Sequence, residues 1–232
     1  MNGFGTVFCV DKNYPDHARE MASWDPCIPG DVVARHEEEP VIFMKPTASI
    51  STDGRTSIPV FDGRPVSSSM HYEFELVLLI GRNADFVSIG NASSFISGYG
   101  VGLDMTLRDV QLEAKKCGNP WLKSKGFRNS ALVSPFVPPE SAGPWEDLSI
   151  SLRLNDRLVQ HSPVSKMTFS PAFLVHYLSY IYGLREGDLV FTGTPAGVGP
   201  VHPSDRLEAV LESGKGNEAK HYTLATLPAT VI

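Results

Sequence analysis

Residues 67–82, "SSSMHYEFELVLLIGR", decide the fold, because they predict a long interior strand that ends at Gly81. Side chains alternate between the two faces of a strand. One face is apolar throughout and carries Tyr72, Phe74, Leu76, Leu78 and Ile80. The other face carries His71, Glu73, Glu75, Val77 and Leu79. This second face is polar at its start and apolar at its end. Glu73 and Glu75 therefore lie where the strand is expected to enter a hydrophobic core.

Glu73 and Glu75 lie on the same face, about 6.6 Å apart by the rise of a strand. Two carboxylates this close to apolar surface repel each other and lose hydration. Either one of them is protonated, or a basic side chain pairs with them, or a cation binds between them. A half-exposed strand whose polar end reaches water is the simpler alternative, since acids are mostly solvated.

Composition and charge describe one ordinary globular domain over residues 1–232. The net charge of −6 and the lack of a basic stripe argue against a nucleic-acid partner. Cys9, Cys27 and Cys117 show neither disulfide nor metal spacing, which favours a reducing compartment. No apolar run is long enough to span a membrane, and the start lacks the basic region of a signal peptide. We therefore expect a cytoplasmic protein with no membrane partner.

The rest of the chain predicts a strand-rich α+β fold. We expect strands at 6–10, 40–46, 95–106, within 148–162 as a hairpin, and from 187 into a Gly- and Pro-rich loop. We expect helices at 13–21, 106–118 and 170–183. Thr106 and Asp109 fit a capping box for the second helix, and Gly118 fits its end. Strands outnumber helices without regular alternation, which favours α+β over a doubly wound sheet.

Asp104, in "GYGVGLDMTLRD", is a third acid with two interpretations. It could be an acid near a helix N-terminus that interacts with the helix dipole. It could instead lie at a strand end beside Glu73 and Glu75 and complete a site of three oxygen ligands. Such a site selects hard cations, namely Mg²⁺, Mn²⁺ or Ca²⁺. The glycines at 98, 100 and 102 do not have the spacing of a dinucleotide-binding loop.

Four ordered motifs resemble those of one known family: "HYEFELVLLIG", "GYGVGLDMTLRDVQ", "CGNPWLKSKGF" and "EGDLVFTGTPAGVGP". Over roughly residues 6–212 the chain resembles the fumarylacetoacetate hydrolase family, in its short single-domain acylpyruvate hydrolase branch. The resemblance implies a mixed β-sandwich or roll with a few short helices. It also implies a Mg²⁺ cofactor, with Mn²⁺ or Ca²⁺ as alternatives, a small 2-keto acid substrate and a homodimer.

The same resemblance assigns roles to individual residues. The implied metal ligands are Glu73, Glu75 and Asp104. The implied substrate-binding residues are Arg108, Gln111, Lys125 and Thr194, with Lys125 also catalytic. His17 and Glu20 match an acid–base pair on a mobile lid over residues 13–30.

Each role has a plain structural alternative. Arg108 with Gln111, and His17 with Glu20, could be solvated helix pairs, and Lys125 could be a surface lysine. "GTPAGVG" could be a structural turn, and His71 could be an ordinary buried histidine. Arg128-Asn129 stands where related sequences place an acid, which leaves the substrate preference open.

These residues predict a metal-dependent hydrolase that cleaves a C–C bond in acylpyruvates, such as fumarylpyruvate or acetylpyruvate, to pyruvate and a carboxylic acid. A bound cation and Lys125 would stabilise the pyruvate enolate, while His17 activates water. The enzymatic alternatives are an oxaloacetate decarboxylase and an isomerase or decarboxylase of aromatic catabolism. The non-enzymatic alternative is a calcium-stiffened binding module, which would have no use for a His17–Glu20 pair.

Overall fold

The computed structural model describes residues 3–24, 39–214 and 221–232. Its large sheet runs in the order β2 (Val41–Lys45), β1 (Val7–Asp11), β14 (Leu189–Phe191), β8 (Phe74–Ile80), β9 (Ile96–Asp104), β11 (Ala131–Val133) and β3 (Ile50–Ser51). A second sheet runs in the order β13 (Arg157–Pro163), β12 (Leu148–Leu154), β16 (Arg206–Gly214), β17 (His221–Val231) and β4 (Arg55–Thr56). Two small sheets contain β10 (Thr106–Leu107), β7 (Met70–Tyr72) and β15 (Gly199–Val201), and β5 (Val60–Phe61) and β6 (Arg64–Pro65).

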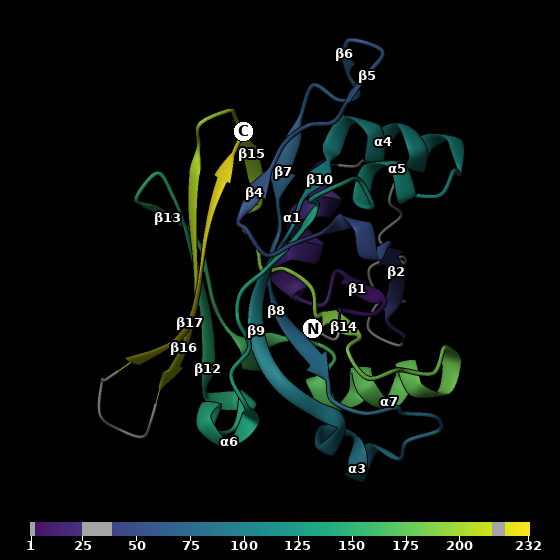
Figure 1. Cartoon of the computed structure of the whole chain (residues 1–232), viewed down its shortest axis with the longest axis vertical. Coiled ribbons are helices and arrows are strands. Elements are labelled where there is room, and N and C mark those ends of the chain that lie inside the picture. The colour runs from purple at the N-terminus through teal and green to yellow at the C-terminus, as the bar shows by residue number, and fades with distance from the viewer. Residues whose placement is uncertain (1–2, 25–38, 215–220) are drawn as a thin grey trace.

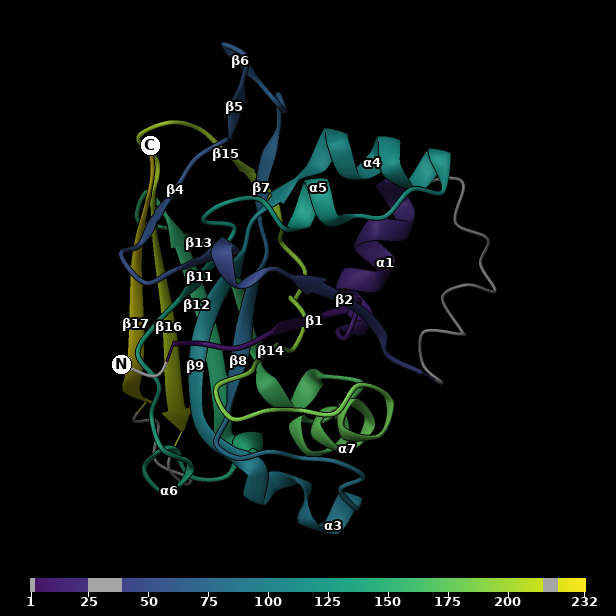
Figure 2. The ribbon, with the colours of Figure 1, turned by 45° about the vertical axis from the view of Figure 1, so that its right-hand side comes forward.

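Most helices lie beside the large sheet, but the short helix at Pro139–Ala142 lies at the lower end of the second sheet in Figures 1 and 2. They are α1 (Pro15–Trp24), α3 (Ile89–Ala92), α4 (Arg108–Cys117), α5 (Leu122–Lys125), α6 (Pro139–Ala142) and α7 (Pro171–Ile181). Short 3-10 turns lie at Thr47–Ser49, Ser93–Phe95, Trp145–Asp147 and Val164–Lys166. The second sheet stands at the left of Figure 1 and the large sheet in the middle, while α1, α4 and α5 gather on the far side of the large sheet in Figure 2. The α+β class expected from the sequence is confirmed.

β8 separates two hydrophobic clusters, as its alternating sequence predicts. Phe74, Leu76 and Leu78 join the main core, to which Ile150 and Leu211 of the second sheet also belong. Val77, on the opposite face, joins a smaller cluster with β1 and β14. Burying both faces of one strand explains why it is apolar at nearly every position beyond Glu75.

The predicted long strand is interrupted at Glu73, and this interruption positions the site. β7 ends at Tyr72 and β8 begins at Phe74, in a different sheet. The neighbouring strand changes sheet at the same level, since β9 ends at Asp104 and β10 begins at Thr106. The Asp104 amide donates to the Glu73 carbonyl at 2.8 Å, so the two acids face each other across the junction.

α4 begins later than the sequence predicts. Thr106 belongs to β10, and the helix starts at Arg108 without a side-chain cap. The capping box is wrong because the Asp109 carboxylate instead accepts hydrogen bonds from Ser67 and Ser68, at 2.5 and 2.8 Å. The end at Gly118 is confirmed, with φ at +67°, a conformation that glycine adopts at little cost.

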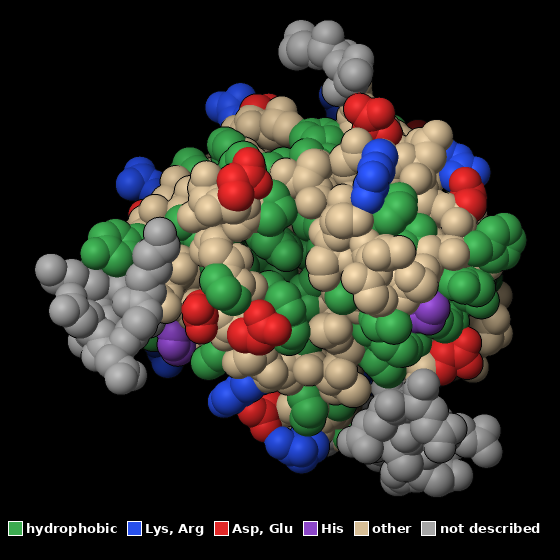
Figure 3. All heavy atoms as spheres, turned by 90° about the horizontal axis from the view of Figure 1, so that it is seen from below, with side chains coloured by type: hydrophobic (Ala, Val, Ile, Leu, Met, Phe, Trp, Pro, Cys, Tyr) green, Lys and Arg blue, Asp and Glu red, His purple; other side chains and the backbone are tan. Residues whose placement is uncertain are grey.

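The helices and the outer surface bear on the expected absence of a membrane span and on the expected homodimer. Among the described residues no helix combines the length and the hydropathy that a membrane span requires. Figure 3 views the face near α3 and α7, where hydrophobic side chains lie among scattered charges. Phe86, Tyr180 and Ile181 of this region are exposed, and the Phe86 and Tyr180 rings meet edge to face at 5.5 Å. The homodimer, the single domain and the cytoplasmic location stay predictions.

Candidate active site

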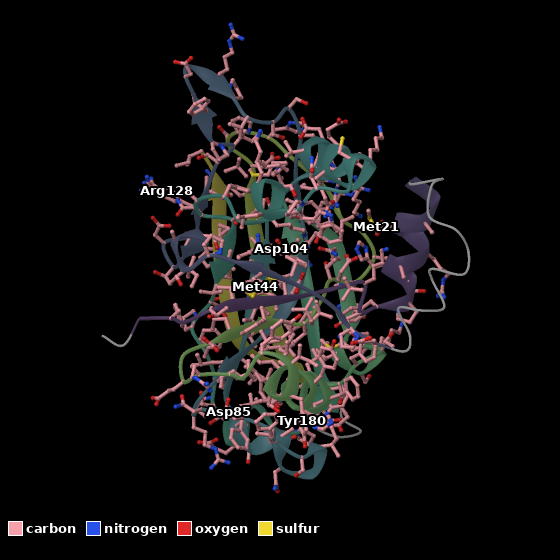
Figure 4. The ribbon with its side chains drawn as sticks, turned by 90° about the vertical axis from the view of Figure 1, so that its right-hand side faces the viewer. Met21, Met44, Asp85, Asp104, Arg128 and Tyr180 are labelled. Carbon is pink, nitrogen blue, oxygen red and sulfur yellow. The ribbon has the colours of Figure 1, made fainter. Side chains whose placement is uncertain are left out.

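Three acids meet at the junction between β7, β8 and β9. Glu73, Glu75 and Asp104 are all buried, and each offers a carboxylate oxygen within 4.8 Å of the others. In Figure 4 the labelled Asp104 lies in the middle of the molecule. The sequence predicted this meeting, and the solvated-strand alternative is wrong for the two glutamates, because they are 7% and 2% exposed.

Glu73 is held as a carboxylate by two cations. Lys125 donates to its Oε2 at 2.7 Å, and Arg108 donates to its Oε1 at 2.5 Å. Burial alone would raise the pKa of Glu73, but Lys125 and then Arg108 hold it well below the ordinary value. A positive charge on His17 would lower the pKa of Glu73 further, so His17 lies close to this carboxylate.

Lys125 bridges two of the acids from inside the molecule. Its Nζ lies 2.7 Å from Glu73 Oε2 and 2.7 Å from Asp104 Oδ2. Burial would lower the pKa of Lys125, but Asp104 and Glu73 raise it above the ordinary value. The surface-lysine alternative is therefore wrong, and Lys125 supplies a fixed positive charge at the centre of the site.

Lys45 is a buried cation that the sequence analysis missed. Its Nζ lies 2.7 Å from Asp104 Oδ1, in a contact too poorly directed to count as a hydrogen bond. It has four acceptors within hydrogen-bond distance for its three protons, namely the carbonyls of Met105, Lys125 and Ser130 and the Ser130 hydroxyl. Lys45 thus fixes Asp104 and the backbone of Lys125 together. At the end of a strand followed by Pro46, it gave no sequence signal of its burial.

Glu75 differs from the other two acids because no cationic side chain contacts it among the described residues. Its Oε2 accepts from the Gly193 amide at 2.7 Å. Burial, and then the charges of Asp104 and Glu73, raise the pKa of Glu75 well above the ordinary value. The three carboxylates therefore fit a hard divalent cation, since a cation would neutralise the one acid that lacks a counter-charge.

Arg108 and Gln111 share one face of α4 and point into the site. Arg108 donates from Nη1 to the Gln111 side-chain oxygen at 2.6 Å, and both residues are buried. The Arg108 Nε atom is buried without a hydrogen-bond partner among the described residues. The solvated-helix alternative is wrong for this pair, and the Nε–H group is left as a donor for a ligand.

His17 and Glu20 form the pair that the sequence predicted. His17 Nδ1 lies 3.1 Å from Glu20 Oε2, and His17 is only 3% exposed. Glu20 also accepts from the Gly197 amide, at 3.1 and 3.2 Å, which ties α1 to the loop after β14. A solvated pair is excluded by this burial. The expected lid spans 13–30, of which residues 25–30 lie outside the described part, and its mobility stays a prediction.

Thr194 lies in the loop after β14 and is fixed by a second residue that the sequence missed. Gln160 of β13 donates to the Thr194 hydroxyl at 2.9 Å and to the Pro195 carbonyl at 2.7 Å. Its own side-chain oxygen accepts from the Phe74 amide at 3.2 Å. This buried amide connects the loop to the start of β8, which places Thr194 near Glu75.

Three residues that the sequence analysis left open, His71, Arg128 and Asn129, lie around the site, outside the group of three acids. His71 lies opposite Thr106 in the small sheet, and burial, followed by Arg108, lowers its pKa to about 4. Arg128 is exposed and lies far from Asp104 in Figure 4. Asn129 has φ at +58°, and this turn leads directly to Ser130, which binds Lys45. The Arg128-Asn129 pair therefore shapes the backbone behind the site.

A comparison with known families decides the affiliation of the chain. The family model described as fumarylacetoacetate (FAA) hydrolase C-terminal matches residues 6–232. The chain belongs to the fumarylacetoacetate hydrolase family. The family assignment made from the sequence motifs is thus confirmed.

Relatives within the fumarylacetoacetate hydrolase family carry several activities. The mitochondrial oxaloacetate tautomerase FAHD1 of Bos taurus is 39% identical over 204 residues, which cover 88% of this chain and 85% of that protein. The oxaloacetate tautomerase YcgM of Escherichia coli (strain K12) is 38% identical over 208 residues, covering 89% of this chain and 88% of that protein. The crystal structure of fumarylpyruvate hydrolase from Pseudomonas aeruginosa with Mn²⁺ and pyruvate has a TM-score of 0.80 and 33% identity, covering 99% of this chain and 90% of that one.

These relatives support an enzyme of the fumarylacetoacetate hydrolase family and leave its reaction open among hydrolysis, tautomerisation, decarboxylation and isomerisation. A binding module without turnover, the non-enzymatic alternative, is disfavoured by the buried His17–Glu20 pair beside the acids. A divalent metal is consistent with the neighbour that binds Mn²⁺ and with the buried acidic triad.

Proposed function

We propose that this protein is a divalent-cation-dependent enzyme that moves a proton in 2-keto acids, with keto–enol tautomerisation of oxaloacetate as its main reaction. Two relatives that match most of the chain are named oxaloacetate tautomerase. This proposal replaces acylpyruvate hydrolysis as the leading activity. The observation that carries it is Lys125 Nζ, 2.7 Å from both Glu73 and Asp104, because a fixed cation beside a metal site favours an enolate.

The 2-keto acid end of the substrate has its donors in place. Arg108 Nε and Gln111 would bind the substrate carboxylate, and Arg108 is already oriented by its bonds to Glu73 and Gln111. Thr194, held by Gln160, would donate to the same end. The cation on Glu73, Glu75 and Asp104 would supply Lewis-acid stabilisation of negative charge on the keto oxygen.

The proton transfer would depend on His17. Its Nδ1 is bonded to Glu20, which leaves Nε2 to exchange a proton with the carbon next to the keto group. Lys125 would donate a hydrogen bond to the enol or enolate oxygen while this proton moves. Glu20 would hold the imidazole orientation, and its bonds to the Gly197 amide fix the pair over the site. No water molecule is consumed in tautomerisation.

Acylpyruvate hydrolysis is the second candidate, favoured by one observation. The His17–Glu20 pair is also suited to remove a proton from water, and a structural neighbour with 33% identity is a fumarylpyruvate hydrolase. Hydrolysis would use the same enolate stabilisation and add attack of water on the distal carbonyl. Oxaloacetate decarboxylation needs the electron sink alone, so it would accompany either activity.

The test compares the reactions on one preparation with saturating Mg²⁺. The loss of enol absorbance from freshly dissolved enol-oxaloacetate reports tautomerisation, and pyruvate release from acetylpyruvate reports hydrolysis. We expect the kcat/KM for tautomerisation to exceed that for hydrolysis by at least tenfold, and EDTA to abolish both. A larger kcat/KM for acetylpyruvate would make hydrolysis the main activity instead.

A further inference from the structure

Gln160 is a buried amide whose orientation is fixed from both sides. It is 2% exposed, and its side-chain oxygen accepts from the Phe74 amide at 3.2 Å. Its nitrogen donates to the Pro195 carbonyl at 2.7 Å and to the Thr194 hydroxyl at 2.9 Å. A backbone N–H can only donate and a carbonyl can only accept, so a flipped Gln160 would oppose donor to donor and acceptor to acceptor. The NH₂ group therefore faces the loop after β14.

A bulge in β13 turns this side chain inward. Leu152 of β12 pairs with Gln160. The next residue of β12, Arg153, pairs with Leu158, so Val159 is the extra residue of β13. Leu158 and Gln160 would share one face of a regular strand, yet Leu158 is 49% exposed and Gln160 is buried. Bulges re-aim side chains next to functional sites, and this one directs Gln160 at the loop after β14.

The loop after β14 joins two parts of the site. The Gly193 amide donates to the Glu75 carboxylate at 2.7 Å. Four residues later, the Gly197 amide donates to Glu20, the partner of the catalytic imidazole, at 3.1 Å. Thr194 lies between these two contacts and is 2% exposed. Its hydroxyl is therefore held at the edge of the acid cluster, where a bound substrate would meet it.

The Thr194 hydroxyl has one proton, and Gln160 determines where that proton can go. The Thr194 oxygen accepts from Gln160, so its own proton is not used in that bond. Among the described residues its acceptor is the Pro195 carbonyl at 3.4 Å, which is long for a hydroxyl hydrogen bond. Gln160 already donates to this same carbonyl at 2.7 Å. A carboxylate bound in the site would be a much stronger acceptor for the Thr194 proton.

We infer that Gln160 is a positioning residue that makes the Thr194 hydroxyl a hydrogen-bond donor to the substrate. It acts through Thr194 and does not touch the substrate itself. This inference rests on the proposed function, because that proposal binds the 2-keto acid end at Thr194. Without Gln160 the Pro195 carbonyl loses the donor that Gln160 supplies. The Thr194 proton would then turn to this carbonyl, and the contact with the substrate would be lost.

The test is a double-mutant cycle in the Mg²⁺-loaded full chain, with Gln160→Met, Thr194→Val and the double variant. Methionine has nearly the length of glutamine but no donor. By titration calorimetry with pyruvate we expect each single variant to bind about 10- to 100-fold more weakly, as for a lost hydrogen bond to a charged group. The double variant should bind at most about threefold more weakly than Thr194→Val, because Gln160 acts through Thr194. Leu158→Met, at an exposed position of the same strand, is the matched control and should leave the affinity unchanged.

Kinetics and a second variant give readouts that a purely structural role would not reproduce. KM for oxaloacetate should rise in Gln160→Met by about the factor measured with pyruvate, while kcat changes little, as for a contact made equally in the ground and transition states. Gln160→Glu replaces Gln160→Met if that variant does not fold. Its carboxylate can still accept from the Phe74 amide but also accepts the Thr194 proton, so pyruvate should again bind at least about tenfold more weakly. Most of that loss should again be absent in the Thr194→Val background.

The outcomes separate this inference from the proposed function. Wild-type pyruvate affinity in the Gln160 variants, or losses that add in the double variant, overturns the role of Gln160 alone. A lower kcat with unchanged pyruvate affinity would show that Gln160 only braces the fold. The expected pyruvate results without any tautomerisation would overturn the proposed reaction and leave the role of Gln160 standing. A wild-type protein that does not bind pyruvate with Mg²⁺ overturns both proposals.

Discussion

Lys45 Nζ and Asp104 Oδ1 lie 2.7 Å apart, and both side chains are fully buried. Lys125 contacts the other oxygen of the same carboxylate, also at 2.7 Å. Asp104 is therefore held between two lysines, Lys45 at the end of β2 and Lys125 at the end of α5. Since Lys45 also bonds to the Lys125 carbonyl, it couples Asp104 to the backbone of Lys125.

Lys45→Met should destabilise the protein strongly. The substitution removes one donor from each of three buried carbonyls and a counter-charge from Asp104. The Lys125 and Ser130 carbonyls keep a second donor, namely the Ser130 hydroxyl and the Met105 amide. Breaking a buried charged pair typically costs about 3–5 kcal/mol of unfolding free energy, and we expect a loss in that range. Urea unfolding measures it, with the exposed Lys123→Met as control. A loss no larger than that of Lys123→Met would contradict the structural role of Lys45.

The three acids should respond differently to amide substitution in metal-free protein. Glu75→Gln should stabilise the fold at neutral pH, because burial and like charges raise the pKa of Glu75. This advantage should shrink as the pH falls and vanish near the ordinary pKa of a carboxyl, because Glu75 is then protonated in the unfolded chain as well as in the folded protein. Glu73→Gln should destabilise, because it leaves Lys125 and Arg108 poorly paired. Urea unfolding at two pH values tests both variants. Equal changes in the free energy of unfolding for Glu75→Gln and Glu73→Gln would show that the two acids do not differ in their counter-charges.

Binding of Mg²⁺ should release protons. The raised pKa of Glu75 means that the metal-free site holds a proton over a pH range where a free carboxylate is ionised, and a cation must displace it. Affinity should therefore increase with pH until Glu75 is ionised, and then level off. Calorimetry in two buffers with different ionisation enthalpies measures the protons released. A binding heat that does not depend on the buffer would refute this account of Glu75.

His17→Ala should separate the reactions that need a base from the one that does not. Loss of a general base typically costs about 10²–10⁴-fold, so tautomerisation and any acetylpyruvate hydrolysis should fall by that range. Decarboxylation of oxaloacetate should fall much less, since Lys125 and the three buried acids remain. Glu20→Gln should have a milder effect of the same kind, because the imidazole is still present. If all three reactions decrease equally, His17 serves only to position α1.

The sequence predicted those parts of the site that depend on local periodicity. Alternation in residues 67–82 placed Glu73 and Glu75 on one face, and helical spacing paired Arg108 with Gln111 and His17 with Glu20. The roles of Lys45 and Gln160 could not be predicted, because each depends on partners 55 or more residues away: Asp104 and Ser130 for Lys45, and Phe74 for Gln160. The start of α4 was misplaced for a similar reason, since Asp109 bonds to a turn 41 residues earlier.

The central claim is that the three buried acids hold a cation on which enolisation depends, and one measurement tests it most directly. Tautomerisation of enol-oxaloacetate is followed during Mg²⁺ titration of EDTA-treated wild type, Glu75→Gln and Asp104→Asn. Wild type should regain full kcat with saturable dependence on Mg²⁺, while both variants should remain at least 10²-fold below it at any Mg²⁺ concentration. Full activity of the EDTA-treated wild type before Mg²⁺ is added, or of Glu75→Gln, would contradict the claim.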